Sequence, residues 1–241
     1  MQTSLPVALS AQLAMEKRLD TLANNLANVG TAGFRAEEVK FESVLSRASS
    51  RSVAFASQGQ QYLSTRAGAL TETGNPLDMA VAGEAFFAIQ TPKGTVYTRD
   101  GRMQMSDAGE LRTVNGEPFL DVGGAPLQID PNGGPIHIAH DGMITQGAGQ
   151  IGAVGLFKMP AGANLSRAGT SGVVPDAKAQ PIVDFDENRI AQGFVEGSNV
   201  NPILEMTRLI EVQRIFEQAA NMIQTSENSL NEAVTQLGAP K

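Results

Sequence analysis

The sequence predicts an α+β fold in which long N- and C-terminal helices pair as a coiled-coil-like domain and the centre of the chain forms an all-β domain. Apolar residues recur at three- and four-residue steps near both chain ends, which is the period of an amphipathic helix. Between the ends, short apolar runs alternate with turn dipeptides, a pattern typical of strands. We therefore expect an N-terminal helical segment at 1–35, a partly extended linker at 36–67, a central β-rich domain at 68–197 and a C-terminal helical segment at 198–241.

The N-terminal helix is expected from Leu5 to Val29. Ser4 precedes it as an N-cap, and Pro6 lies in the first turn, where its missing N–H costs little. Gly30 and Gly33 then supply the residues that commonly end a helix. The steps of four and three that define a coiled-coil seam are occupied by Met15, Leu19, Leu22, Leu26 and Val29.

The C-terminal helix begins with Asn201 as N-cap and Pro202 at the first helical position, and Glu205 complements the helix dipole. No glycine or proline interrupts it before Gly238, so as one helix it is about 50 Å long. Its seam positions are Met206, Leu209, Phe216, Ile223, Leu230 and Val234. Ile203, Ile210 and Met222 widen the apolar face beyond one seam, which indicates more than one helical neighbour.

The centre of the chain is predicted to be all β. Phe86 to Ile89 and Ile136 to Ala139 are representative strands, and dipeptides such as Asp100-Gly101 and Asp141-Gly142 are typical of tight turns. In the preceding linker, helical character is expected from Glu37 to Leu45, followed by an extended segment.

The two terminal helices cannot bury all of their apolar side chains against each other. Ordering this much helix costs more backbone entropy than the seam residues of a two-helix hairpin recover by burial. Neighbouring subunits are therefore expected to cover the remaining surface.

Composition excludes several classes of protein. The chain has no cysteine, so disulfides, thiolate nucleophiles and cysteine-ligated metals are ruled out. Its net charge of −7 has the wrong sign for binding phosphates, and we expect no nucleic-acid partner. No apolar run is long enough to span a membrane, and the start of the chain lacks the basic stretch of a secretory signal.

Three segments resemble the signatures of the axial rod and hook proteins of the bacterial flagellum. The first is Leu19 to Val29 with Thr31 to Arg35. The second runs from Thr73 to Asp78 and includes Gly83, Phe86-Phe87 and Tyr97 to Gly101. The third is Glu196 to Pro202 with Glu205-Met206. Within the family, the short length and the Glu196 to Asn201 sequence are most similar to the proximal rod proteins, with the distal rod proteins as the alternative.

This resemblance implies a structural rod subunit that polymerises through its terminal helices. It implies export by the flagellar type III apparatus, partners among other rod proteins and copies of the chain itself, and a location in the rod that crosses the periplasm. Asn24, Asn25 and Asn28, with Asn199 and Asn201, are then expected to take part in subunit packing. A solvated polar helix face is the alternative for the first three, and a cap and turn for the last two.

No enzymatic site is predicted. Gly147 to Gly152 matches a dinucleotide-binding spacing but lacks the helix that must open at it, so a glycine-rich hairpin is expected. His137 and His140 would face opposite sides of a strand, and the calcium-like series Asp184, Asp186, Asn188 lacks its glycine and its glutamate. We expect no catalytic residue, metal or cofactor. A secreted β-rich binding protein such as an adhesin, and a hydrolase, are the competing classes.

Overall fold

The computed structural model describes residues 4–41, 43–46, 53–57 and 59–238. They divide into two compact units, which we call the helical unit and the β unit. The helical unit comprises Met1–Ala27, Glu37–Gln61 and Asn201–Lys241, and the β unit comprises Asn28–Ala36 and Tyr62–Val200. The chain thus passes between the units at 27–28, 36–37, 61–62 and 200–201.

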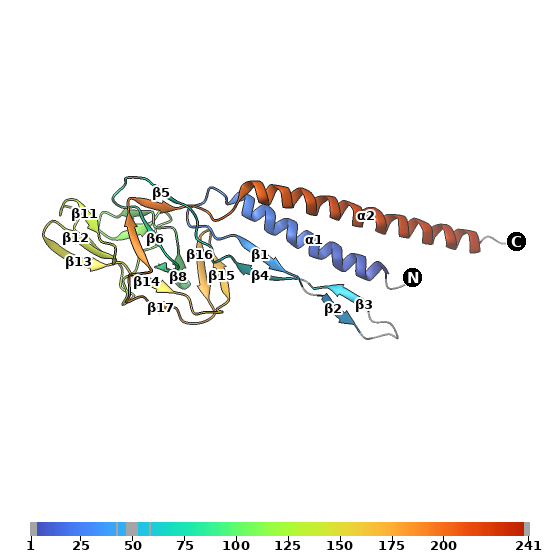
Figure 1. The fold of residues 1–241 in the computed structure, drawn as a ribbon, viewed down its shortest axis with the longest axis horizontal. Helices are drawn as coiled ribbons and strands as arrows, with labels where there is room; N and C mark the ends of the chain where they lie inside the picture. The colour runs from blue at the N-terminus through green and yellow to red at the C-terminus, as the bar shows by residue number, and fades with distance from the viewer. Residues whose placement is uncertain (1–3, 42, 47–52, 58, 239–241) are drawn as a thin grey trace. The chain divides into compact units, whose positions relative to one another are not determined.

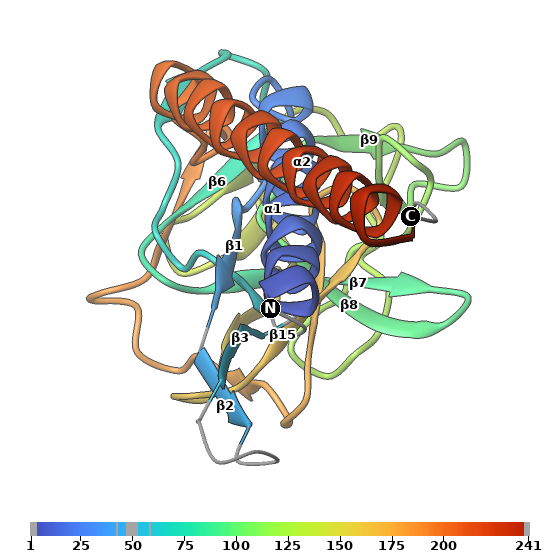
Figure 2. The same ribbon diagram turned by 90° about the vertical axis from the view of Figure 1, so that its right-hand side faces the viewer.

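Two helices dominate the helical unit, α1 (Ser4–Ala27) and α2 (Pro202–Gly238). They lie side by side in opposite directions, so that α1 begins on the side of the unit toward which α2 runs (Figures 1 and 2). The predicted start of the second helix is confirmed, because Asn201 accepts hydrogen bonds from the N–H groups of Leu204 and Glu205 through its side chain and its carbonyl (3.1 and 3.0 Å). The first helix ends two residues earlier than expected, and 28–30 form a turn.

The helical character expected from Glu37 to Leu45 is wrong. This segment contains β1 (Glu37–Lys40) and β2 (Ser43–Ser46); β2 pairs antiparallel with β3 (Val53–Ala56), and β1 pairs with β4 (Gln60–Leu63). The backbone N–H and C=O of Glu37 are both hydrogen-bonded to the side chain of Asn25 (2.8 Å each), which holds the start of β1 extended. Contacts distant in sequence thus override a weak local preference.

The β unit is built on a six-stranded sheet in the order β15-β16-β8-β7-β14-β17. Its strands are β7 (Phe86–Thr91), β8 (Gly94–Thr98), β14 (Leu156–Lys158), β15 (Leu165–Ala168), β16 (Gly172–Pro175) and β17 (Gln180–Pro181). The smaller sheets are formed by β5 (Leu70–Glu72), β6 (Met79–Ala82), β9 (Met103–Met105), β10 (Leu111–Thr113), β11 (Ile136–Ile138), β12 (Met143–Gln146), β13 (Gly149–Ala153), β18 (Arg189–Gln192) and β19 (Phe194–Glu196).

A single large apolar core lies inside the β unit. Phe87 and Phe119 meet edge to face with their ring centroids 6.1 Å apart, and Met79, Leu111 and Ile144 are fully buried around them. These side chains come from β6, β7, β10 and β12 and from the loop that carries Phe119. The predicted strands at Phe86 to Ile89 and Ile136 to Ala139 are found as β7 and β11.

The glycine-rich hairpin is confirmed as well. β12 and β13 pair antiparallel from Gln146 and Gly149 onward, and Gly147 turns the chain with a φ of +60°. Gly149 to Gly152 therefore lie in a strand, where no helix opens to receive a phosphate. Neither helix in the described part of the chain combines the length and the apolar content needed to cross a bilayer.

Candidate functional site

The three segments that resemble family signatures meet at a buried ion cluster in the β unit, formed by Arg35, Arg99 and Glu196. Nη2 of Arg35 lies 3.1 Å from Oε1 of Glu196, and Nε of Arg99 lies 3.3 Å from Oε2. All three residues are 1 or 2% exposed. Each signature segment contributes one charge, so the cluster joins parts of the chain that are far apart in sequence.

Two cations face one anion in this cluster, and neutral groups stabilise the surplus positive charge. The guanidinium of Arg99 donates to the backbone carbonyls of Ala85 (2.5 Å) and Gly83, and that of Arg35 donates to the carbonyl of Arg66. Both guanidiniums also lie over the ring of Phe86, 5.2 and 5.8 Å from its centroid, where the negative face of the ring attracts a cation.

Burial lowers the pKa of both arginines, and the attraction of Glu196 opposes this effect. For Arg99 the pKa falls to about 10, so its guanidinium stays charged at neutral pH. Nε of Arg99 and Oε2 of Glu196 are at ion-pair distance but make no hydrogen bond with any described residue. Their desolvation is thus compensated by charge attraction alone, which makes the cluster sensitive to the loss of either partner.

Backbone hydrogen bonds continue from the cluster along the segments 33–36 and 196–199. Gly33 donates to the carbonyl of Glu196 (2.8 Å), and Asn199 donates to that of Phe34 (3.2 Å). The side chain of Asn199 accepts from Ala36 N–H (2.7 Å) and donates to the carbonyl of Arg66 (2.7 Å). The segment that follows α1 and the segment that precedes α2 are therefore bonded to each other inside the β unit.

In the helical unit, Asn25 is 2% exposed and its amide is used within the chain. Besides the two bonds to Glu37, its Nδ2 donates a hydrogen bond to Oε2 of Glu205 at 3.2 Å. The other carboxylate oxygen, Oε1 of Glu205, accepts a hydrogen bond from Nη1 of Arg208 at 3.0 Å. The amide thus links α1, β1 and α2. A solvated position, one alternative from the sequence, does not describe this asparagine.

Replacing Asn25 by alanine is expected to lower the free energy of unfolding of the helical unit by about 1–3 kcal/mol, because it leaves the buried backbone groups of Glu37 unpaired. Thermal melting followed by circular dichroism at the helix signal measures this loss. Asn221→Ala, at an exposed position of α2, is the matched control and is expected to change stability by less than about 0.5 kcal/mol. Equal effects of the two substitutions would contradict the structural role of Asn25.

The other predicted packing residues are distributed over both units. On α1, Leu22 is buried and the half-buried positions are Met15, Leu19, Asn24 and Leu26; after the helix, Asn28 is half-buried and Val29 exposed. On α2, Asn201 and Met206 are exposed, and Leu209, Phe216 and Ile223 are half-buried. Asn199 is half-buried in the β unit, and the side chains of Leu230 and Val234 lie outside the described residues.

Sequence reasoning did not assign the ion cluster. Arg35, Arg99 and Glu196 each lie within a recognised segment, but ion pairs between distant residues leave no periodic pattern that a single sequence reveals. One local sign was available for two of them: Arg35 stands between Phe34 and Ala36, and Glu196 between Val195 and Gly197, so each charge has apolar or small neighbours.

Comparison with protein families gives three matches along the chain. Residues 5–35 match the flagella basal body rod protein family, 80–146 match the flagellar hook protein FlgE/F/G D1 domain, and 191–237 match the flagellar basal body rod FlgEFG protein C-terminal family. Arg35, Arg99 and Glu196 fall one in each match, so the ion cluster connects the three matched regions.

Individual relatives match over nearly the whole chain. The flagellar basal-body rod protein FlgF of Mesorhizobium japonicum is 53% identical over 99% of both chains, and FlgF of Rhizobium meliloti is 46% identical over 100% of both. FlgG of Bacillus subtilis is 32% identical over 97% of this chain and 98% of its own. The chain therefore belongs to the flagellar basal-body rod protein family, as a relative of the FlgF proteins.

Proposed function

We propose that the chain is a structural subunit of the proximal part of the flagellar rod, and that it polymerises through its terminal helices to transmit torque. The families it matches are structural, and the chain is not an enzyme. The higher identity to the two FlgF proteins than to FlgG of Bacillus subtilis favours a proximal over a distal position.

The observation that carries this proposal is a set of exposed apolar side chains on α2. At about 100° per residue, Glu205, Val212 and Phe216 fall on the inward face of the helix, which is buried or half-buried. Two exposed apolar stripes lie on either side of that face. One consists of Ile203, Met206 and Ile210, and the other of Leu204, Ile215 and Met222.

The side chains of these stripes are exposed enough that burying them in a contact would contribute substantially to the free energy of association. Ile203 is 76% exposed and Met222 is 68% exposed. Full burial of such a side chain contributes roughly 1.5–3 kcal/mol. Two stripes on different sides of one helix call for two neighbours, so lateral packing between subunits accounts for both.

We further propose that α1 and α2 pair as a coiled-coil-like domain. In support, Leu22 is buried, and Leu209, Phe216 and Ile223 are half-buried on the inward side of α2. Subunit packing then involves Asn24, Asn28, Val29, Asn199, Asn201 and Met206. It extends to Leu230 and Val234, whose side chains lie outside the described residues. Export through the flagellar type III apparatus into a rod that crosses the periplasm fits a chain without cysteine.

The test places a charge on each stripe. Ile210→Asp and Met222→Asp, expressed in a strain from which the native gene is deleted, are expected to abolish swimming in soft agar, because an aspartate cannot be buried without a partner. Basal bodies purified from these strains should lack a complete rod. Gln218→Asp adds the same charge between the two stripes and is expected to leave swimming intact. Normal swimming with both stripe variants would refute assembly through α2.

A further inference from the structure

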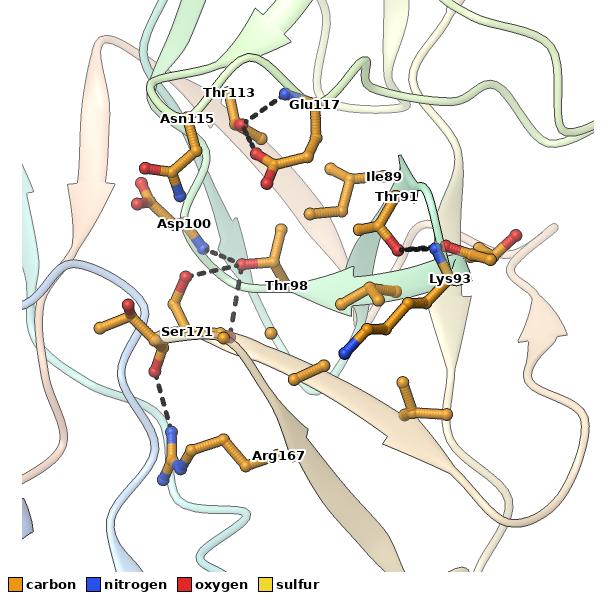
Figure 3. A pocket seen from close by; sticks show the side chains of 18 of the residues that line it. Ile89, Thr91, Lys93, Thr98, Asp100, Thr113, Asn115, Glu117, Arg167 and Ser171 are labelled. Atoms are coloured by element: carbon orange, nitrogen blue, oxygen red, sulfur yellow. Dashed lines mark hydrogen bonds between the residues drawn. The ribbon is translucent and has the colours of Figure 1, made fainter.

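A cavity of about 720 Å³ opens in the β unit (Figure 3). It is bordered by the β7–β8 hairpin, by the turn that follows β10 and by the β15–β16 hairpin. The volume exceeds that of one side chain and falls in the range of sites that hold a ligand or a short stretch of chain.

Most of the polar groups in the cavity are already paired with one another. Arg102 makes two hydrogen bonds to Asp100 (2.9 and 2.6 Å), and Glu117 accepts one from the hydroxyl of Thr113. Arg167 donates to the carbonyls of Thr170 (2.9 Å) and Arg35 (2.6 Å).

Lys93 is the exposed cation of this cavity (Figure 3). No carboxylate in the described part of the chain forms an ion pair with its ammonium group. The rim also carries two exposed apolar side chains, Val114 at 50% and Val174 at 38%. The cavity therefore offers a positive charge and an apolar surface together, on a chain whose net charge is −7.

The same β unit presents a surface of the opposite character in the loop between β17 and β18, residues 182–188. Val183 is 87% exposed, more than any other large apolar side chain of the described residues. Asp184, Asp186 and Glu187 are exposed beside it, and Arg189, at the start of β18, is the one cation near them in sequence. None of these loop residues borders the cavity.

Packing against the core and hydrogen bonds of Asn188 hold this loop in place. Ile182 is buried in the core, Phe185 packs against the core, and Oδ1 of Asn188 accepts hydrogen bonds from the N–H groups of Glu84 (2.9 Å) and Ala85 (3.0 Å). Because these residues fix the backbone, the exposed position of Val183 does not come from a loosely held loop. A pre-organised loop loses little conformational entropy when it binds.

We propose that the 182–188 loop of one copy docks into the cavity of a second copy, with Val183 against Val114 and Val174 and the loop carboxylates facing Lys93. This proposal rests on the proposed function and extends it to the β unit. The two contacting surfaces are different, so the contact is head to tail and can repeat from subunit to subunit. An open helical array is the expected product of such a contact, as a rod requires.

Because the chain has no cysteine, single cysteines can report this contact in the full-length protein. Val183→Cys chains are mixed at high concentration with size-tagged Val114→Cys chains and oxidised mildly. Mixed disulfide dimers are then counted by mass. Val122→Cys replaces Val114→Cys in the control, since Val122 is similarly exposed (46%) but does not border the cavity. We expect the yield of mixed dimer to be about tenfold higher with Val114→Cys than with the control.

Charge reversal provides a second readout of the same contact. Lys93→Glu in the Val114→Cys chain is expected to reduce the mixed dimer to the control level, and Asp184→Lys in the Val183→Cys chain is expected to restore it. Both positions are exposed, so neither change should alter thermal melting. Equal yields for Val114→Cys and Val122→Cys would overturn the proposal, as would charge reversal without effect.

The outcomes separate this proposal from assembly through the helices. If the stripe variants of α2 abolish swimming while the Val183–Val114 yield equals that of the control, helical assembly stands and the β-unit contact is wrong. If the cross-link forms while the stripe variants swim normally, the β-unit contact stands and assembly through α2 is wrong.

Discussion

Replacing Glu196 by glutamine is expected to lower the free energy of unfolding of the β unit by about 3–5 kcal/mol. The substitution keeps the size of the side chain but removes the only carboxylate of the buried cluster, and it leaves the charges of Arg35 and Arg99 facing each other. Both guanidiniums are fully buried, so water cannot replace the lost countercharge. Urea unfolding followed by far-ultraviolet circular dichroism measures the loss.

Glu110→Gln is the matched control for this measurement. Glu110 also pairs with an arginine, Arg112, at 2.6 Å, but the arginine is 45% exposed and solvent screens the pair. Its loss is expected to cost less than about 1 kcal/mol. If the two glutamine substitutions lowered the free energy of unfolding equally, the buried cluster would not stabilise the β unit more than an exposed ion pair does.

Gly33→Ala is expected to destabilise the β unit by about 2–5 kcal/mol, the sum of backbone strain and overpacking. Gly33 has a φ of +66°, and a Cβ added there would lie 2.3 Å from the backbone nitrogen of Asp100 and 2.6 Å from the carbonyl carbon of Arg99. These backbone atoms cannot move aside as a flexible side chain would. The displaced segment would also lose the hydrogen bond from Gly33 to Glu196.

The neighbouring glycine supplies the control for this prediction. A Cβ at Gly30 meets no atom within 4 Å, so Gly30→Ala is expected to change stability by less than about 0.5 kcal/mol. The same urea titration compares the two variants. Swimming assays of both strains show whether the close packing of Gly33 against Arg99 and Asp100 is needed in the assembled rod. A Gly33→Ala protein as stable as Gly30→Ala would show that the close approach to Arg99 and Asp100 is not required.

The sequence predicted the elements whose causes are local. The start of α2 follows from the Asn201 cap and Pro202, and the hairpin around Gly147 follows from its glycines, so both could be placed from a few adjacent residues. Residues 37–45 could not, since β1 is held by the side chain of Asn25 and by pairing with β4, neither of which is visible nearby in the chain.

The candidate site shows the same division. The three signature segments could be recognised from the sequence. That they meet at Arg35, Arg99 and Glu196 depends on the tertiary fold of the β unit, which brings residues distant in sequence together. For Asn25 a role between subunits was predicted, and the structure shows that its amide is hydrogen-bonded within the helical unit. Its role in packing between subunits stays a prediction.

The hydrogen bonds that follow the ion cluster have a mechanical consequence. Gly33 bonds to Glu196 and Ala36 to Asn199, so the segments 33–36 and 196–199 run in the same direction. Pulling the start of the first segment against the end of the second loads these bonds in shear, and they must rupture together with the ion pair between Arg35 and Glu196 rather than open one after another. The paired segments thus resist stretching most strongly when residues 33 and 199 are pulled apart along the direction of the two segments.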